Sequence, residues 1–356
     1  MSPLVPKRDD LASLDGYHSP QVPAEVRLNT NESPLAPPAG WPDAFASEIA
    51  RVDANRYPDR DAVALRSALA ELHCVDPAEV FCANGSNEVL QCLLLAFGGP
   101  GRVVATFEPT YALHAFIARL TGTPVVSGSR NERFEVELDV VRALMADHRP
   151  VITFLCSPNN PTGNADPIEL TEHVIAEAPG LVVVDEAYGQ FAPASATRFR
   201  DRPGAEGLVV VRTFSKTWAL AAARLGYLLA DPAVVEACQA VALPYHLSAY
   251  TQAAGLAALE FGAEMEERVA LVSEERGRVA AALGELAVET WPSDANFILF
   301  RPLTHPAPAV WQGLVDRSIL IRDVSGRPEL ADCLRVTIGT TAENDRFLCA
   351  LEECLR

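Results

Sequence analysis

Short runs of valine, isoleucine and leucine alternate with segments of helical periodicity over most of the chain. The apolar runs have the length of strands and occupy 102–107, 123–128, 151–156, 181–187, 207–214 and 224–230. Apolar residues recur at helical spacing in 61–72, 89–97, 111–120 and 138–148. Continuous apolar strands that alternate with helices are typical of a mainly parallel sheet covered on both faces. We therefore predict an α/β fold.

The two ends of the chain depart from this pattern. Residues 1–40 are rich in proline and polar side chains, and proline removes a backbone donor and restricts its predecessor, so we expect an extended arm. An Ala-, Glu- and Arg-rich segment at about 248–286 predicts a long linking helix, and three strand-like runs follow it at 297–300, 319–322 and 334–339. We predict a large domain over 41–245 and a small α/β domain over 246–356, with the arm contributing to the small domain and the substrate pocket.

Composition and charge narrow the functional class. Hydrophobic residues make up 49% and charged residues 21% of the 356 residues, which is ordinary for a globular enzyme. No apolar run approaches the roughly 20 residues of a membrane helix, and the first residues lack the apolar core of a secretory signal, so we expect a cytoplasmic protein. The formal net charge of −18 repels nucleic acid and anionic membranes, and we expect neither as a partner. The eight cysteines show no zinc spacing, and we expect no metal site.

Several polar residues fall where the predicted parallel strands end, which is where open α/β sheets bind ligands. Asp185 follows the apolar run 181–184, Asn160 follows 151–156, and Lys216 follows 207–214 by two residues. The turn at 85–87 precedes a predicted helix, whose free N–H groups and dipole favour an anion. Each feature alone has an ordinary explanation as a loop start, a surface lysine or a helix cap. Their order and spacing in combination point to a site.

That combination resembles the fold type I aminotransferases over nearly the whole chain. S-P-N-N-P-T-G (157–163) is similar to the family's Asn-Pro-Thr-Gly signature, V-V-V-D-E-A-Y (182–188) to its Asp-x-x-Tyr strand end, and T-F-S-K-T-W-A-L-A-A-A-R-L-G (213–226) to its cofactor-lysine segment. Further segments resemble the histidinol-phosphate branch: N-T-N-E-S-P (29–34), N-R-Y-P-D (55–59), G-S-N-E (85–88), E-P-T-Y (108–111), S-D-A-N-F-I-L (293–299), I-L-I-R-D (319–323) and L-R-V-T-I-G-T (334–340). The resemblance implies a pyridoxal 5'-phosphate enzyme that transfers the amino group of histidinol phosphate to 2-oxoglutarate in histidine biosynthesis.

The resemblance also implies roles around the cofactor ring. Lys216 would bond to the cofactor aldehyde and later move the substrate proton. Asp185 would keep the ring nitrogen protonated, which makes the ring an electron sink. Tyr188 and Asn160 would hydrogen-bond the phenolic oxygen of the ring, and Tyr111 would stack on its face.

At the phosphate end of the cofactor, the resemblance implies a set of backbone, hydroxyl and guanidinium donors. These donors are Ser86, Asn87, Thr213, Ser215 and Arg224. Tyr57 would reach the phosphate in the neighbouring subunit, which implies a homodimer with shared sites. For the substrate, the resemblance implies contacts with Asn29 and Tyr17 of the arm, and with Arg322 and Arg335 at its anionic end.

The sequence departs from the family pattern at two places. Alanines stand at 221–223 where the family commonly has glycine, which would strain the turn if one of them needs a positive φ. The arm lacks the proline often found just before the residue that Tyr17 resembles.

Three other functions are compatible with the same motifs. A decarboxylase resembling threonine-phosphate decarboxylase would keep the lysine, the aspartate and the phosphate donors. An aromatic or other biosynthetic aminotransferase would differ only in substrate. A regulator with an inactive aminotransferase fold is disfavoured, because the chain is acidic and Lys216, Asp185 and Arg224 are all present.

Overall fold

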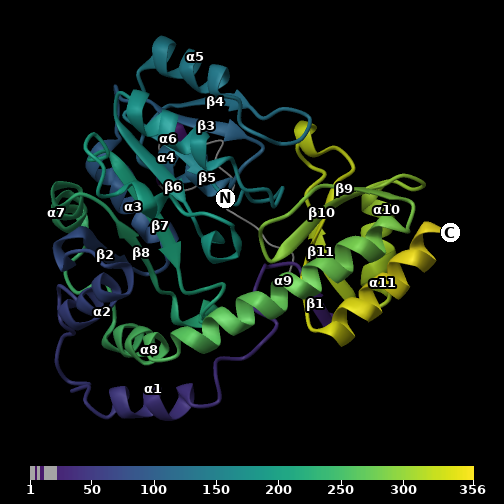
Figure 1. Ribbon diagram of the computed structural model, residues 1–356, viewed down its shortest axis with the longest axis horizontal. Helices are drawn as coiled ribbons and strands as arrows, with labels where there is room; N and C mark the ends of the chain where they lie inside the picture. The colour runs from purple at the N-terminus through teal and green to yellow at the C-terminus, as the bar shows by residue number, and fades with distance from the viewer. Residues whose placement is uncertain (1–4, 6–8, 12–21) are drawn as a thin grey trace.

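The computed structural model describes Val5, Asp9–Leu11 and residues 22–356, and it contains two sheets flanked by helices (Figure 1). The larger sheet has seven strands in the order β2-β8-β7-β6-β5-β3-β4. Their bounds are Val80–Ala83 (β2), Val104–Glu108 (β3), Val125–Ser129 (β4), Ile152–Cys156 (β5), Leu181–Asp185 (β6), Leu208–Thr213 (β7) and Gly226–Leu229 (β8). The strands β3 to β7 pair in parallel, and β8 runs antiparallel to its neighbours β7 and β2. The predicted mainly parallel sheet is confirmed.

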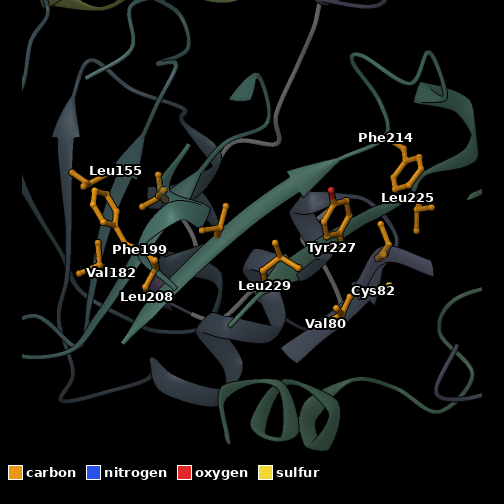
Figure 2. Packing of buried hydrophobic residues seen from close by; sticks show 14 of the residues in the cluster. Val80, Cys82, Leu155, Val182, Phe199, Leu208, Phe214, Leu225, Tyr227 and Leu229 are labelled. Carbon is orange, nitrogen blue, oxygen red and sulfur yellow. The ribbon is translucent and has the colours of Figure 1, made fainter. Parts of the chain in front are cut away.

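Helices cover both faces of this sheet, because alternate residues of each strand point to opposite sides. Val182 and Val184 of β6 pack into one core with α2 (Val63–His73), α5 (Leu138–His148) and α6 (Ile168–Glu177). Val183 packs into the other core with α3 (Ser86–Phe97), α4 (Leu113–Leu120) and α7 (Pro232–Val241). Figure 2 shows part of the first core, where side chains of neighbouring strands such as Val182 and Leu208 contribute. Each large apolar side chain buried in this way contributes about 1.5–3 kcal/mol.

The smaller sheet has five strands in the order β1-β11-β12-β10-β9. Four come from the C-terminal part of the chain: β9 (Val288–Thr290), β10 (Phe297–Pro302), β11 (Ile319–Asp323) and β12 (Leu334–Thr337). The fifth, β1 (Val26–Leu28), comes from the N-terminal arm and pairs in parallel with β11. Helices α9 (Gly262–Gly284), α10 (Ala307–Asp316) and α11 (Thr341–Leu355) pack with this sheet around a separate core. The domain limits at 40 and 245 stay a prediction.

The long helical stretch predicted at about 248–286 consists of two helices, the second of which is the longer. Two residues, Glu260 and Phe261, separate helix α8 (Ala249–Leu259) from α9, and Phe261 has φ −111° and ψ 38°. Gly262 follows, a residue of low helix propensity. The Phe261 ring lies against Gly40, where an added Cβ would come within 2.9 Å of the ring, next to α1 (Trp41–Ile49). Of the helices in the described part of the chain, none is both long and apolar enough to span a bilayer.

Candidate active site

The carboxyl ends of β5, β6 and β7 open into one cavity of about 420 Å³, the main cavity. The rest of its wall comes from the N-terminus of α3, the residues after β1, the loop at 221–224, Tyr111, and Arg335 of β12. Most residues predicted for the cofactor and the substrate line it: Asn29, Ser86, Asn87, Tyr111, Asn160, Asp185, Tyr188, Thr213, Ser215, Lys216, Arg224 and Arg335. Side chains from segments far apart in sequence therefore meet where the motifs predicted a site.

Two predicted residues that the structure describes, Arg322 and Tyr57, do not line the main cavity. Arg322 lines a side cavity of about 230 Å³, which shares Tyr111, Asn160 and Arg335 with the main cavity. Tyr57 is 79% exposed and stacks on Tyr245, with ring centroids 4.5 Å apart. Tyr17 lies outside the described residues.

Asp185 is buried at the end of β6, with only 2% of its surface exposed. Its Oδ1 accepts a hydrogen bond from the backbone N–H of Ala187 at 3.1 Å, and its Oδ2 lies 2.9 Å from Nε2 of His114. A buried carboxylate is costly unless hydrogen bonds or cations compensate it. Since Asp185 also lines the main cavity, it is placed to pair with a cationic N–H of a bound ring.

His114 was not predicted from the sequence. It lies fully buried on α4, and its ring stacks on Phe154 with centroids 4.8 Å apart. In the sequence it is a single histidine in an apolar helical segment, and such a residue is usually part of the core. Only the fold places it behind Asp185.

Lys216 projects into the main cavity from the loop after β7. Its Nζ donates to the backbone carbonyl of Thr30 at 3.0 Å and lies 5.6 Å from the centroid of the Tyr188 ring. Burial, and then the positive charge of Arg335, lowers the pKa of Lys216 from 10.5 to about 7, against the opposing effect of Glu32. The lowered pKa increases the share of the amine that is uncharged at neutral pH, and this is the form that attacks an aldehyde.

This lowered pKa predicts the pH dependence of cofactor attachment. For cofactor-free protein, the rate at which pyridoxal phosphate bonds to Lys216 should rise as pH increases through about 7 and level off above it, because deprotonation creates the nucleophile. Stopped-flow absorbance of the bonded cofactor measures that rate. Lys216→Ala should give no such signal at any pH. A rate that keeps climbing toward pH 10, as for an exposed lysine, would contradict the assignment.

Tyr188 and Asn160 lie where a ring oxygen could be bound. Burial raises the pKa of Tyr188 to about 12, so its hydroxyl stays protonated and can donate. That hydroxyl accepts a hydrogen bond from Nδ2 of Asn31 at 2.9 Å. Asn160 Oδ1 accepts from Nη1 of Arg335 at 2.5 Å, and Nη2 of Arg335 donates to the backbone carbonyl of Asn29 at 2.8 Å. Arg335 thus joins Asn160, predicted for the cofactor, to Asn29, predicted for the substrate.

Asn31 was also missed, although it stands in the segment N-T-N-E-S-P that the sequence analysis quoted. It has a positive φ of 54° and is buried. Thr337 Oγ1 donates to its Oδ1 at 3.0 Å, and its own N–H donates to Thr337 Oγ1 at the same distance. A single residue thereby joins the arm, β12 and the hydroxyl of Tyr188.

The opposite end of the main cavity gathers donors suited to a phosphate. Helix α3 begins at Ser86, and Gly85 before it has φ +78°; a Cβ there would lie 2.6 Å from Nη2 of Arg224. Glycine thus lets the guanidinium approach the helix start. Arg224 Nη1 donates to Ser215 Oγ at 3.5 Å, and Thr213 Oγ1 donates to Ser215 Oγ at 3.1 Å.

The alanines at Ala221–Ala223 cause no backbone strain. They form a short 3-10 helix, and the positive φ angles of this loop fall on Ala219 (56°) and Arg224 (53°) instead. The departure from the family glycine is therefore tolerated by the backbone of this turn.

Together these groups fit pyridoxal 5'-phosphate. Helix N–H groups, two hydroxyls and Arg224 suit its phosphate, and buried Asp185 suits its ring nitrogen. Lys216 lines the same cavity and, with Lys7, is one of only two lysines in the chain. Tyr111 also lines the cavity, and its hydroxyl donates to Asn87 Oδ1 at 3.0 Å.

Comparison with known proteins gives a consistent result. The family model described as aminotransferase class I and II matches residues 23–351. A histidinol-phosphate aminotransferase of Frankia casuarinae is 47% identical over 99% of this chain and 90% of its own length, and that of Thermobifida fusca is 47% identical over 98% and 95%. The structure of histidinol-phosphate aminotransferase from Sinorhizobium meliloti in complex with pyridoxal-5'-phosphate superposes with a TM-score of 0.84 at 26% identity, covering 94% of this chain and 92% of that one.

Proposed function

Because the chain belongs to the class I and II aminotransferase family, we propose that it transfers the amino group of histidinol phosphate to 2-oxoglutarate. The enzyme is a pyridoxal-phosphate-dependent aminotransferase. The observation that best supports this substrate is the side cavity, in which Arg322 and Arg335 lie next to the predicted cofactor site. The relatives from Frankia casuarinae and Thermobifida fusca, named for this activity, support the same substrate.

Bound pyridoxal phosphate supplies an aldehyde that bonds to amines and a ring that accepts electrons from the substrate carbon. Asp185 would hold the ring nitrogen protonated, and the protonated hydroxyl of Tyr188 would donate to the ring oxygen. Lys216, with its lowered pKa, is suited to take a proton from the substrate carbon and to return one.

Arg335 would orient the substrate. Its guanidinium is held by Asn160 and by the carbonyl of Asn29, so it is fixed at the border of the two cavities. A planar guanidinium can donate two parallel hydrogen bonds to a carboxylate or a phosphate. The same residue can therefore serve both the phosphorylated donor and the dicarboxylate acceptor.

A substrate panel on the purified enzyme tests the proposal. Histidinol phosphate with 2-oxoglutarate should release glutamate, with kcat/KM at least about 100-fold above that for phenylalanine or tyrosine, which leave the phosphate site unfilled. Comparable values would favour the broader aromatic aminotransferase. Carbon dioxide released from threonine phosphate would favour a decarboxylase.

We also propose a homodimer in which Tyr57 completes the site of the other subunit. Tyr57 and Tyr245 form a stacked pair that is 79% and 42% exposed, outside the main cavity of their own chain. Such an exposed aromatic pair suits contact with a second copy. The cytoplasmic location and the absence of nucleic-acid or membrane partners stay predictions.

A mixing experiment tests the shared site. Tyr57→Phe should weaken pyridoxal phosphate binding about 10-fold, since it removes one hydrogen bond to a charged group. Subunit exchange between Tyr57→Phe and Lys216→Ala should restore sites with wild-type cofactor affinity, because each mixed dimer combines an intact Lys216 with an intact Tyr57. Cofactor titration of the mixture measures the fraction of sites with wild-type affinity. A mixture that titrates as the simple average of its parents would rule out sharing.

A further inference from the structure

The side cavity is bordered by a third arginine, Arg327, that the sequence motifs did not indicate. It lies in the loop between β11 and β12, whereas Arg322 and Arg335 lie on those two strands, paired in register. The side cavity shares Arg335 and Asn160 with the main cavity. A substrate held at Lys216 can therefore extend its far end toward all three arginines.

Arg327 forms an ion pair that joins the two sheets. Its Nη1 lies 3.0 Å from Oε2 of Glu108, the last residue of β3, and donates to the backbone carbonyl of Thr110 at 3.0 Å. The same Glu108 oxygen accepts from the N–H of Thr110 at 3.1 Å. The two side chains are 34% and 25% exposed, and Arg327, which lines the side cavity, pairs with Glu108 at 3.0 Å.

The charges around the side cavity are closely balanced. Arg322, Arg327 and Arg335 provide three positive charges, against Glu108 and Asp323, which also lines the cavity. The net charge of these five side chains is therefore +1. Without Arg327 this net charge would fall to zero. The carboxylate of Glu108 would then have no paired cation and would repel an entering anion. A phosphate monoester carries about −1.5 to −2 charges at pH 7, so it would be affected more strongly than a single carboxylate.

We propose that Arg327 determines specificity for a substrate with a phosphate group, by neutralising Glu108 and keeping the side cavity positive. This inference rests on the proposed function. Arg327→Gln should lower kcat/KM for histidinol phosphate at least 10-fold more than kcat/KM for glutamate. Glutamine preserves most of the length and an N–H that can donate to Thr110, so the substitution chiefly removes charge.

A second substitution separates charge from structure. In the double variant Glu108→Gln with Arg327→Gln, both charges are removed, and Arg322 and Arg335 against Asp323 again leave one positive charge. The preference for the phosphate should therefore return to within about 3-fold of wild type, since the net charge acting on the anion is restored. If the ion pair had only a structural role, the double variant should recover no preference for the phosphate, because it has lost both partners.

The experiment uses holoenzyme and two readouts. The first is the ratio of kcat/KM for histidinol phosphate to that for glutamate. The second is the inhibition constant of inorganic phosphate against the glutamate half-reaction, which does not require histidinol phosphate. Arg301→Gln is the matched control, because Arg301 pairs with Glu289 at 2.9 Å outside both cavities. It should leave both readouts unchanged.

For Arg327→Gln, the ratio of the two kcat/KM values should fall at least 10-fold and the inhibition constant of phosphate should rise at least 10-fold. Both should recover in the double variant. Equal losses for both substrates, an unchanged phosphate inhibition constant, or a double variant no better than Arg327→Gln would each overturn the role of Arg327. Wild-type enzyme that is inhibited by phosphate but does not use histidinol phosphate would instead refute the proposed function alone.

Discussion

Substitution of Lys216 by alanine is expected to lower the transamination rate by at least about 10⁴-fold, because it removes both the covalent attachment and the proton-transferring base. The side chain lines the main cavity, and its amine has a pKa of about 7. The chain has one other lysine, Lys7, which lies outside the described residues. The yellow absorbance of bonded cofactor should disappear together with turnover.

Reduction with borohydride makes this test specific. In the wild type, it should fix the cofactor on the peptide that contains Lys216, as read by mass spectrometry. Lys7→Arg, the matched control, should keep both label and turnover. Lys216→Ala should still bind pyridoxal phosphate reversibly, because the donors at Ser86, Ser215 and Arg224 are intact, and such binding excludes unfolding as the cause. Turnover that persists in Lys216→Ala would refute the catalytic assignment.

The strands that form the site could be predicted because their signal is local. The strands β5, β6 and β7 are buried on both faces and therefore form continuous apolar runs. Their carboxyl ends meet at one edge in any parallel sheet, so Asp185 and Lys216 could be brought together without coordinates. The family motifs then supplied the roles that spacing alone left open.

Other parts of the fold have no local signal. Strand β1 has three residues in a proline-rich arm and is a strand because Val26 pairs with Ile319, almost 300 residues later. The strands β2 and β9 are similarly short and were not predicted. At the break between α8 and α9, the ring of Phe261 lies against Gly40, which is far away in the sequence. Such pairings are set by tertiary contacts that override local propensity.

The same limit applies to the residues that support the site. His114 contacts Asp185 across 71 positions, and Arg327 contacts Glu108 across 219. Asp185 and Glu108 belong to segments with a recognisable pattern, whereas His114 and Arg327 do not. A lone histidine on an apolar helix or an arginine in a loop gains meaning only when the fold supplies its neighbour.

Asp185→Asn is expected to lower kcat about 10²- to 10³-fold, the range seen when one preorganised electrostatic group is removed from an active site. The amide has nearly the same volume, so the packing around this buried position is kept, but it cannot stabilise a protonated ring nitrogen. Single-turnover absorbance with glutamate measures the loss. Asp231→Asn is the control, because Asp231 caps α7 at a distance from the cavity and asparagine caps equally well.

A double-mutant cycle then separates the carboxylate from the histidine behind it. His114→Phe keeps a ring against Phe154 but removes the contact with Asp185, and it should cost about 10-fold in kcat by letting the carboxylate shift. His114→Gln, which retains an N–H that can donate, should recover most of that loss. If His114 acts only through Asp185, adding His114→Phe to Asp185→Asn should cost little more. Two losses that simply multiply would show that the histidine acts independently, for instance through the packing of α4.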